Sequence, residues 1–138
     1  MDLADATPFL TDHQQAVVVT VGEQDVPHAS NVLYHFDGDT FRVSVTDDRV
    51  KTTNLRRRPL ALMHVSSEDF WRWVAAECDA DLSPVSAEAG DAVGQELLDL
   101  YETLTGPHPH PEEFLQAMVD DHRLVLRLTA RRVYGQLG

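Results

Sequence analysis

The chain has 138 residues and a formal net charge of −12, with 43% hydrophobic and 25% charged residues. This length and composition are typical of a single globular domain covering residues 1–138, and they exclude general disorder. Twelve Asp or Glu and no Lys or Arg lie between Trp73 and His122, so this long part of the chain would repel nucleic-acid backbones and anionic membranes.

The only cysteine, Cys78, excludes an intrachain disulfide and fits a reducing compartment. Its place in an apolar strand pattern favours a buried thiol over a nucleophile. The acidic N-terminus lacks the basic start and apolar run of a signal peptide, and no stretch approaches ~18 consecutive apolar residues. We therefore expect a cytoplasmic protein.

The first predicted elements follow from turn signals and β-branched runs. Thr7-Pro8 is typical of an N-cap followed by proline, and it predicts a short helix through about Gln14. The run Ala16–Val21 predicts a buried strand, and Gly22–Asp25 predicts a turn. Residues 28–36 predict one strand whose faces separate two sets of side chains: Val32, Tyr34 and Phe36 on one face, and Asn31, Leu33 and His35 on the other.

A second strand and a helix are expected next. Asp37-Gly38-Asp39 is a hairpin signal that leads into residues 41–46, where apolar and polar residues alternate as in a half-buried strand. We expect the helix that follows to be stopped by Pro59. Its N-cap is predicted to be one of three residues: Thr46, Asp47 or Asp48.

The charges of this helix differ at its two ends. Arg56–Arg58 fall in the last turn, where cations complement the helix dipole, so they need no functional explanation. Arg49 and Lys51 fall at the positive end, where each exposed cation costs ~0.3–1 kcal/mol. A bound anion would reverse that cost, because backbone N–H groups, the dipole and two cations would converge on it. The residues alone leave two interpretations open, an anion site and a solvated charged face.

The second half of the chain predicts further strands and two helices. The expected elements are strands at 60–66 and 70–78, a sheet extension at 81–85, helices at about 90–105 and 112–121 with a stiff loop at 106–111 between them, and a closing strand from 124 toward 133. Trp71 and Trp73 would share one strand face, for which sheet packing is favoured over a ring platform or dimer contact. Strands joined mainly by hairpins, with few and peripheral helices, favour an antiparallel barrel.

Common catalytic and metal motifs are absent from the sequence. There is no Gly-rich dinucleotide fingerprint, Walker loop, HExxH helix, CxxC pair or GxSxG elbow. His108 and His110 form an HxH pair, but their proline-rich acidic loop favours a solvated loop over a metal site, so no metal is predicted. Three further histidines lie on strand patterns and are expected to be structural: His28, His35 and His64.

Three blocks carry a family resemblance: Asn31–Phe36 (NVLYHF), Ser44–Asn54 (SVTDDRVKTTN) and Leu55–Pro59 (LRRRP). In these blocks the sequence resembles the pyridoxamine 5′-phosphate oxidase-like split barrels, and within that superfamily the branch that binds the deazaflavin coenzyme F420. The similarity covers about residues 8–135 and continues through these segments: Trp71–Glu77, Leu98–Thr105, the histidine-proline loop, Phe114–Asp121 and Arg123–Gly135. The order and spacing of the blocks are more specific than any single motif.

The resemblance implies a mainly β, antiparallel split barrel that forms a homodimer with one cofactor in each of two interface grooves. The cofactor's phosphate and acidic tail would be held by Ser44, Thr46, Arg49, Lys51 and Asn54, and Val45 is also counted among the cofactor-binding residues. Asn31 and Val32 would lie along the ring system, and Trp71 would reach the cofactor of the other subunit. Two segments depart from the family pattern and concern the substrate pocket: Glu77-Cys78-Asp79, where many relatives carry a small residue, and GPHPHPEEF, which lacks a common tryptophan.

By this resemblance the protein is expected to be an F420-dependent reductase that transfers a hydride from reduced deazaflavin to a small conjugated organic acceptor. No catalytic side chain is named, because the cofactor carries the chemistry. Two alternatives stay open: an FMN-dependent oxidoreductase of the same fold, and a non-catalytic protein that binds F420, flavin or haem. Each of these ligands is an anion that Arg49 and Lys51 would attract.

Overall fold

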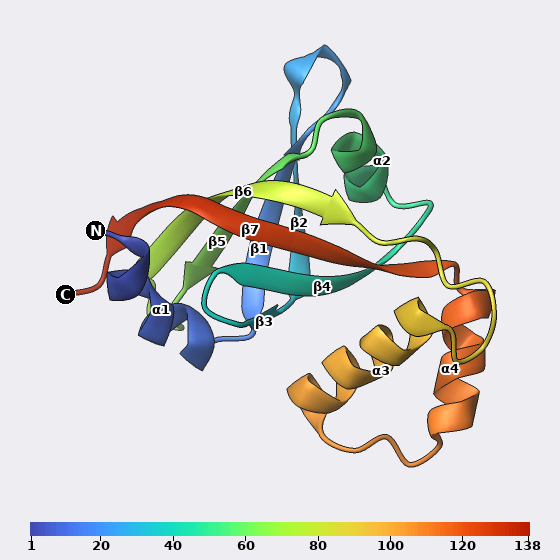
Figure 1. Ribbon diagram of the computed structural model, residues 1–138. Coiled ribbons are helices and arrows are strands. Elements are labelled where there is room, and N and C mark those ends of the chain that lie inside the picture. The colour runs from blue at the N-terminus through green and yellow to red at the C-terminus, as the bar shows by residue number, and fades with distance from the viewer.

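A single antiparallel sheet of seven strands forms the body of the molecule in the computed structural model, which describes residues 1–138 (Figure 1). The strands are β1 (Gln15–Val21), β2 (Pro27–Leu33), β3 (His35–Phe36), β4 (Thr40–Thr46), β5 (Leu60–Ser66), β6 (Trp73–Leu82) and β7 (Arg123–Gln136). The helices are α1 (Leu3–Asp12), α2 (Val50–Arg57), α3 (Ala92–Thr105) and α4 (Pro111–Asp120), with one short 3₁₀ turn at Glu23–Asp25.

The strand order makes the sheet close on itself. The order is β2-β1-β5-β6-β7-β4-β3, so β2 and β3 form the two edges. These two edge strands are consecutive in the chain and are separated only by Tyr34. The sheet must therefore curl until its edges meet, and the Tyr34 N–H donates to the Gln14 carbonyl at 2.9 Å at this corner. The predicted antiparallel barrel, mainly β with peripheral helices, is confirmed.

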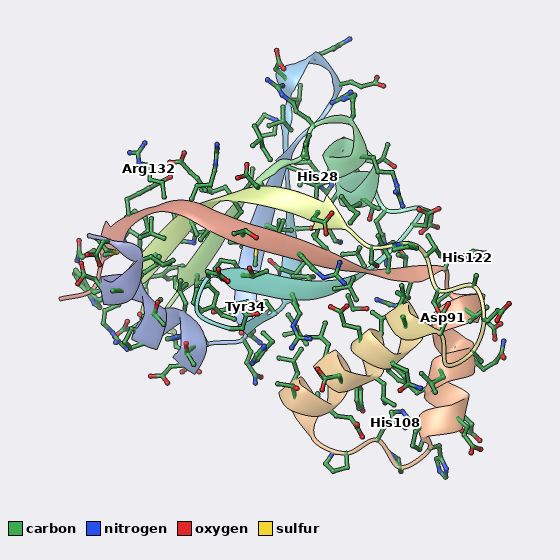
Figure 2. All side chains as sticks on the ribbon, in the orientation of Figure 1. His28, Tyr34, Asp91, His108, His122 and Arg132 are labelled. Atoms are coloured by element: carbon green, nitrogen blue, oxygen red, sulfur yellow. The ribbon has the colours of Figure 1, made fainter.

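The core of the barrel consists of the inward-facing side chains of the strands, because alternate residues of each strand point inside. Tyr34 and Phe41 are fully buried, and their rings meet edge to face at 5.0 Å. Helix α1 covers one end of the barrel with Phe9 and Leu10 (Figure 1). The Tyr34 hydroxyl donates to the Leu10 carbonyl at 2.8 Å and so ties α1 to the barrel corner (Figure 2).

The first helix begins earlier than predicted. Asp2 is the N-cap, and Asp2 and Asp5 form a reciprocal capping box with two hydrogen bonds of 2.9 Å. Thr7 is therefore inside the helix, where its hydroxyl donates to the Leu3 carbonyl, and Pro8 is also internal. The prediction of Thr7 as N-cap is wrong because the Asp2–Asp5 pair satisfies the helix start one and a half turns upstream.

Two predicted strands have different limits. The strand predicted at 28–36 is divided into β2 and β3 at Tyr34, where the barrel turns its corner. The strand predicted at 70–78 begins only at Trp73 and continues to Leu82, so it includes part of the predicted extension. Phe70 and Trp71 belong to the preceding turn, in which Asp69 Oδ1 accepts the Trp71 N–H at 3.1 Å. Trp71 and Trp73 therefore do not share a strand face.

Helices α3 and α4 form a pair at one side of the barrel, beside β4 and β7 (Figure 1). Leu97, Met118 and Val125 make a small second core between the pair and the sheet. Arg42 and Arg127, opposite each other in the β4–β7 ladder, bind carboxylates of α3: Arg42 lies 3.2 Å from Asp99, and Arg127 pairs with Glu96. None of the helices is both long and apolar enough to cross a lipid bilayer.

Candidate functional site

The junction between β4 and α2 leaves the start of the helix without a side-chain cap. Arg49 is the N-cap residue in extended conformation, and no side chain accepts a hydrogen bond from the first turn. The Thr46 hydroxyl donates to Asp48 at 2.9 Å, and Asp47 pairs with Arg56 at 2.6 Å. The prediction that Thr46, Asp47 or Asp48 caps this helix is wrong, because these side chains are engaged elsewhere in the junction.

The cations of the last turn are neutralised within the protein. Arg56, Arg57 and Arg58 lie 2.6 Å, 3.8 Å and 2.5 Å from carboxylate oxygens of Asp47, Glu23 and Asp25, respectively. Arg56 and Arg57 fall in the last turn of α2, and Arg58 is the C-cap residue. These three residues therefore have a structural role, as their place at the negative end of the helix dipole predicts.

A few cations of this acidic protein have no carboxylate partner. Seven of the eleven Lys and Arg residues form ion pairs. Of the other four, Arg72 lies over the Phe9 ring at 5.3 Å. The remaining three are close enough to influence one another, and they are Arg49, Lys51 and Arg123. A net charge of −12 makes three adjacent unpaired cations a distinctive feature of this surface.

The pKa of Lys51 is lowered in part by repulsion from the other two cations. Its pKa lies below the ordinary value of 10.5, first because burial disfavours the charged amine and then because Arg49 and Arg123 repel it. Arg123 begins β7 directly opposite Thr46 in the β4 ladder, and its guanidinium donates to Ser44 Oγ at 3.1 Å. An anion bound among the three cations would relieve the repulsion and stabilise the charged lysine.

Arg123 is a functional candidate that the sequence analysis missed. Arg123 lies 72 positions after Lys51, beyond the helix predicted at 112–121, so no local pattern connects the two residues. One signal was available, because Arg123 is the first cation after the acidic stretch that ends at His122. The β4–β7 register then brings it beside Ser44.

A pocket of about 440 Å³ opens next to these cations. Ser44, Lys51 and Arg123 form its cationic end, and residues 31–33 of the edge strand β2 form one side. Helices α3 and α4 provide a mostly apolar wall made of Leu97, Leu100, Tyr101, Leu104, Thr105, Phe114, Met118 and Asp121. The pocket thus combines an anion-binding end with an apolar surface of the kind that holds the body of a small organic ligand.

A second pocket, of about 380 Å³, lies on the other flank of β2. It shares residues 31–33 with the first pocket, and its other lining residues come from β1 and β5: Gln15, Ala16, Val17, His64 and Ser66. Strand β2 pairs only with β1, so the N–H and C=O groups of its free edge have no strand neighbour. Residues 31–33 are therefore accessible from both sides.

The structure brings together five of the predicted cofactor residues. Asn31, Val32, Ser44 and Lys51 line the first pocket, and Arg49 adds its charge next to Lys51. The other four lie elsewhere. Val45 is 2% exposed in the barrel core, and the Asn54 amide donates to Thr20 Oγ1 at 3.1 Å inside the protein. Thr46 is the last residue of β4, opposite Arg123, but its hydroxyl donates to Asp48 and it does not line the pocket. Trp71 is 73% exposed in the β5–β6 turn, and its contact with a second subunit stays a prediction.

The remaining candidate groups have structural surroundings. The His108 ring packs at 5.0 Å from Tyr101 and 5.3 Å from Phe114 in the loop that joins α3 to α4 (Figure 2). Its Nδ1 accepts the His110 N–H at 2.9 Å, and no group of three potential metal ligands occurs anywhere in the chain. Cys78 is buried, and burial raises the pKa of its thiol to about 12, so it is not a nucleophile at neutral pH.

Comparison with known proteins gives one family and several structures of the same fold. Residues 4–137 match the family described as pyridoxamine 5′-phosphate oxidase. A conserved hypothetical protein of Mycobacterium tuberculosis is 23% identical, covers 99% of this chain and 84% of its own, and has a TM-score of 0.76. An F420 reductase is 19% identical, with a TM-score of 0.71, and the match covers 91% of this chain and 94% of the reductase. The haem storage protein HutZ of Vibrio cholerae is 12% identical, with a TM-score of 0.69, and the match covers 97% of this chain and 94% of HutZ. At these identities the structural likeness shows the fold alone.

Proposed function

The chain belongs to the pyridoxamine 5′-phosphate oxidase family, and we propose that within it this protein is an F420-dependent reductase acting on a small conjugated organic acceptor. The observation that carries the proposal is the convergence of Arg49, Lys51 and Arg123, all without carboxylate partners, at the end of a pocket with an apolar wall. The similarity in fold to an F420 reductase supports this choice of cofactor.

The donor set fits an anionic cofactor. Coenzyme F420 carries a phosphate and an oligoglutamate tail, and both are attracted by cations and by helix N-termini. Arg49, Lys51, Arg123 and the uncapped first turn of α2 would hold these groups, and Ser44 Oγ adds a polar contact beside Arg123. Lys51 would gain most, because a bound anion offsets the repulsion from its two cationic neighbours.

The ring system of the cofactor would lie along β2. Asn31 and Val32 face both pockets, and the free edge of this strand offers backbone donors and acceptors to the polar rim of a flavin-like ring. When bound, reduced deazaflavin supplies a hydride, which is the difficult part of the reaction. The residues of this chain then need only bind and orient the two reactants and exclude water between them.

We also propose that the protein works as a homodimer that covers β2. This strand has one unpaired edge, and Leu33 at its end is 52% exposed. On the same outer surface His64 stacks on Trp73 at 5.4 Å, and Trp73 meets Tyr134 edge to face at 6.0 Å. A second copy bound there would bury this stripe of the sheet and complete the groove beside residues 31–33. Sedimentation as a monomer at micromolar concentration would contradict the dimer.

Titration with F420 and, separately, with FMN tests the choice of cofactor. Binding is followed by quenching of tryptophan fluorescence and by calorimetry at low and high salt. We expect F420 to bind at micromolar concentration or more tightly, and salt to weaken the binding, because the contacts are ionic. A preference for FMN would transfer the proposal to a flavin oxidoreductase. Binding of F420 without oxidation of its reduced form by any acceptor would favour a cofactor carrier.

A further inference from the structure

The pocket beside the unpaired cations has two chemically different halves. Lys51, Arg123 and Ser44 occupy one end. The other half is formed by α3, α4 and the residue after α4, whose side chains there are mostly apolar or aromatic: Leu97, Leu100, Tyr101, Leu104, Phe114 and Met118, with the polar Thr105 and the acidic Asp121. No Lys or Arg side chain lines this second half. If the anionic cofactor takes the cationic end, the apolar half is left for the second reactant.

Aromatic rings give this apolar half a defined wall. Tyr101 and Phe114 lie 5.2 Å apart across the α3–α4 interface, and His108 closes a three-ring cluster behind them. The loop is held in place because the His108 N–H donates to Glu102 Oε2 at 3.0 Å. Such a wall favours flat, apolar ligands, since aromatic faces and edges pack well against another ring.

The charge around the apolar half is negative and largely uncompensated. Residues 92–121 contain seven acidic side chains and no Lys or Arg. Glu96 and Asp99 are paired with Arg127 and Arg42. The other five form no ion pair, and they are Glu102, Glu112, Glu113, Asp120 and Asp121, of which Asp121 itself lines the pocket. Charges within a Debye length of ~8–10 Å act on an approaching ligand, so this end disfavours a second anion.

We infer that the pocket selects its second substrate by charge, and that the acceptor is an uncharged, flat conjugated carbonyl compound bound under α3 and α4, with carboxylates rejected. This inference rests on the proposed function, because the cofactor must already occupy the cationic end. Lys51 and Arg123 then no longer attract a free carboxylate, and the field of the acidic helices determines the selection. The cationic end of the pocket thus binds the anionic cofactor, and the apolar end binds the neutral substrate.

A matched ligand pair tests the inference without turnover. Methyl cinnamate and cinnamate share one conjugated ring system and differ mainly in charge. Their affinities are measured by calorimetry with the full-length protein saturated with oxidised F420, at low and at high salt. We expect the ester to bind at least about tenfold more tightly than the acid at low salt, and the difference to shrink at high salt.

Two variants locate the origin of the difference. The double substitution Glu102→Gln with Asp121→Asn keeps the side-chain shapes and removes two charges, so it should narrow the preference for the ester. Asp12→Asn removes an exposed charge at the end of α1, which does not line this pocket, and should leave the preference unchanged. Equal binding of ester and acid, binding of the acid alone, or binding of neither would overturn the inference. Failure of F420 itself to bind would instead overturn the proposed function.

Discussion

Replacing Arg123 tests the cationic group most directly, because this residue has no partner other than Ser44 Oγ. We expect Arg123→Gln to fold normally, since it removes a half-exposed charge and no ion pair. A hydrogen bond to a charged group contributes ~1.5–3 kcal/mol, so the loss of one such contact should weaken F420 binding by roughly 10- to 150-fold. Arg132→Gln is the matched control, because Arg132 lies at the far end of the same strand and pairs with Glu77 (Figure 2).

The assay uses a feature of the composition, which is that Lys51 is the only lysine in the chain. Lysine labelled with carbon-13 at Cε therefore gives one side-chain signal, whose chemical shift follows the pKa of Lys51. Burial lowers this pKa first, and Arg49 and Arg123 lower it further. Removing Arg123 takes away one repelling charge, so the pKa of Lys51 should rise in Arg123→Gln. It should also rise in the wild-type protein when F420 binds, because the anion favours the charged amine.

Two results would refute this reasoning. One is a Lys51 titration that is the same in the wild type and in Arg123→Gln, which would mean that the two cations do not interact. The other is an equal loss of F420 affinity in Arg123→Gln and Arg132→Gln, which would mean that only the overall charge matters. The Lys51 signal needs no cofactor turnover, so the electrostatic argument can fail separately from the proposed activity.

Three further predictions concern stability and reactivity. Tyr34→Phe leaves the Leu10 carbonyl without its buried donor and should lower the free energy of unfolding by ~1–2 kcal/mol, measured in urea. Hydrogen bonds from backbone N–H groups, that of Ala87 first, lower the pKa of Asp91 from 3.8 to about 2, so its contribution to stability is complete above pH 3.8 and is lost as the pH falls through about 2. Asp91→Asn keeps a cap residue and should flatten the acid unfolding profile in that range. Cys78, with a pKa of about 12, should resist thiol reagents at pH 8 until the protein is unfolded, and fast native-state labelling would contradict its burial.

Local patterns predicted the parts of the site that are close together in the chain. Arg49 and Lys51 lie at the start of α2 as the strand and helix pattern indicates, because both elements are specified within residues 41–59. Arg123 could not be placed in this way, since only the β4–β7 register brings it beside Ser44. The apolar wall was equally inaccessible, because α3 is placed by contacts that are distant in sequence: the packing of Leu97 on Met118 and Val125, and the ion pairs with Arg42 and Arg127.

Two errors have local causes. The alternation that assigned Trp71 to a strand continues into the turn, where hydrogen bonds of Asp69 with Ser67 and Trp71 hold another conformation. The start of α1 could have been predicted from Asp2 and Asp5, two acidic residues three positions apart that form a capping box. The Thr7-Pro8 pair, which is also typical of a helix start, led instead to a predicted start that is too late in the chain. Turn and cap hydrogen bonds of this kind compete with periodicity over a few residues.

The single-residue link at Tyr34 has a consequence for how the protein opens and closes. Because β2 continues through Tyr34 directly into β3, the strand that lines both pockets also joins the two edges of the sheet, which must separate when the barrel opens. The β2 amide protons that bond to β1 near Tyr34 should exchange with solvent only when the barrel as a whole opens, whereas those on its unpaired edge and at the Pro27 end should exchange without such opening. A ligand bound to residues 31–33 would therefore stabilise the whole barrel against opening, and its affinity could be measured as slower hydrogen exchange throughout the barrel.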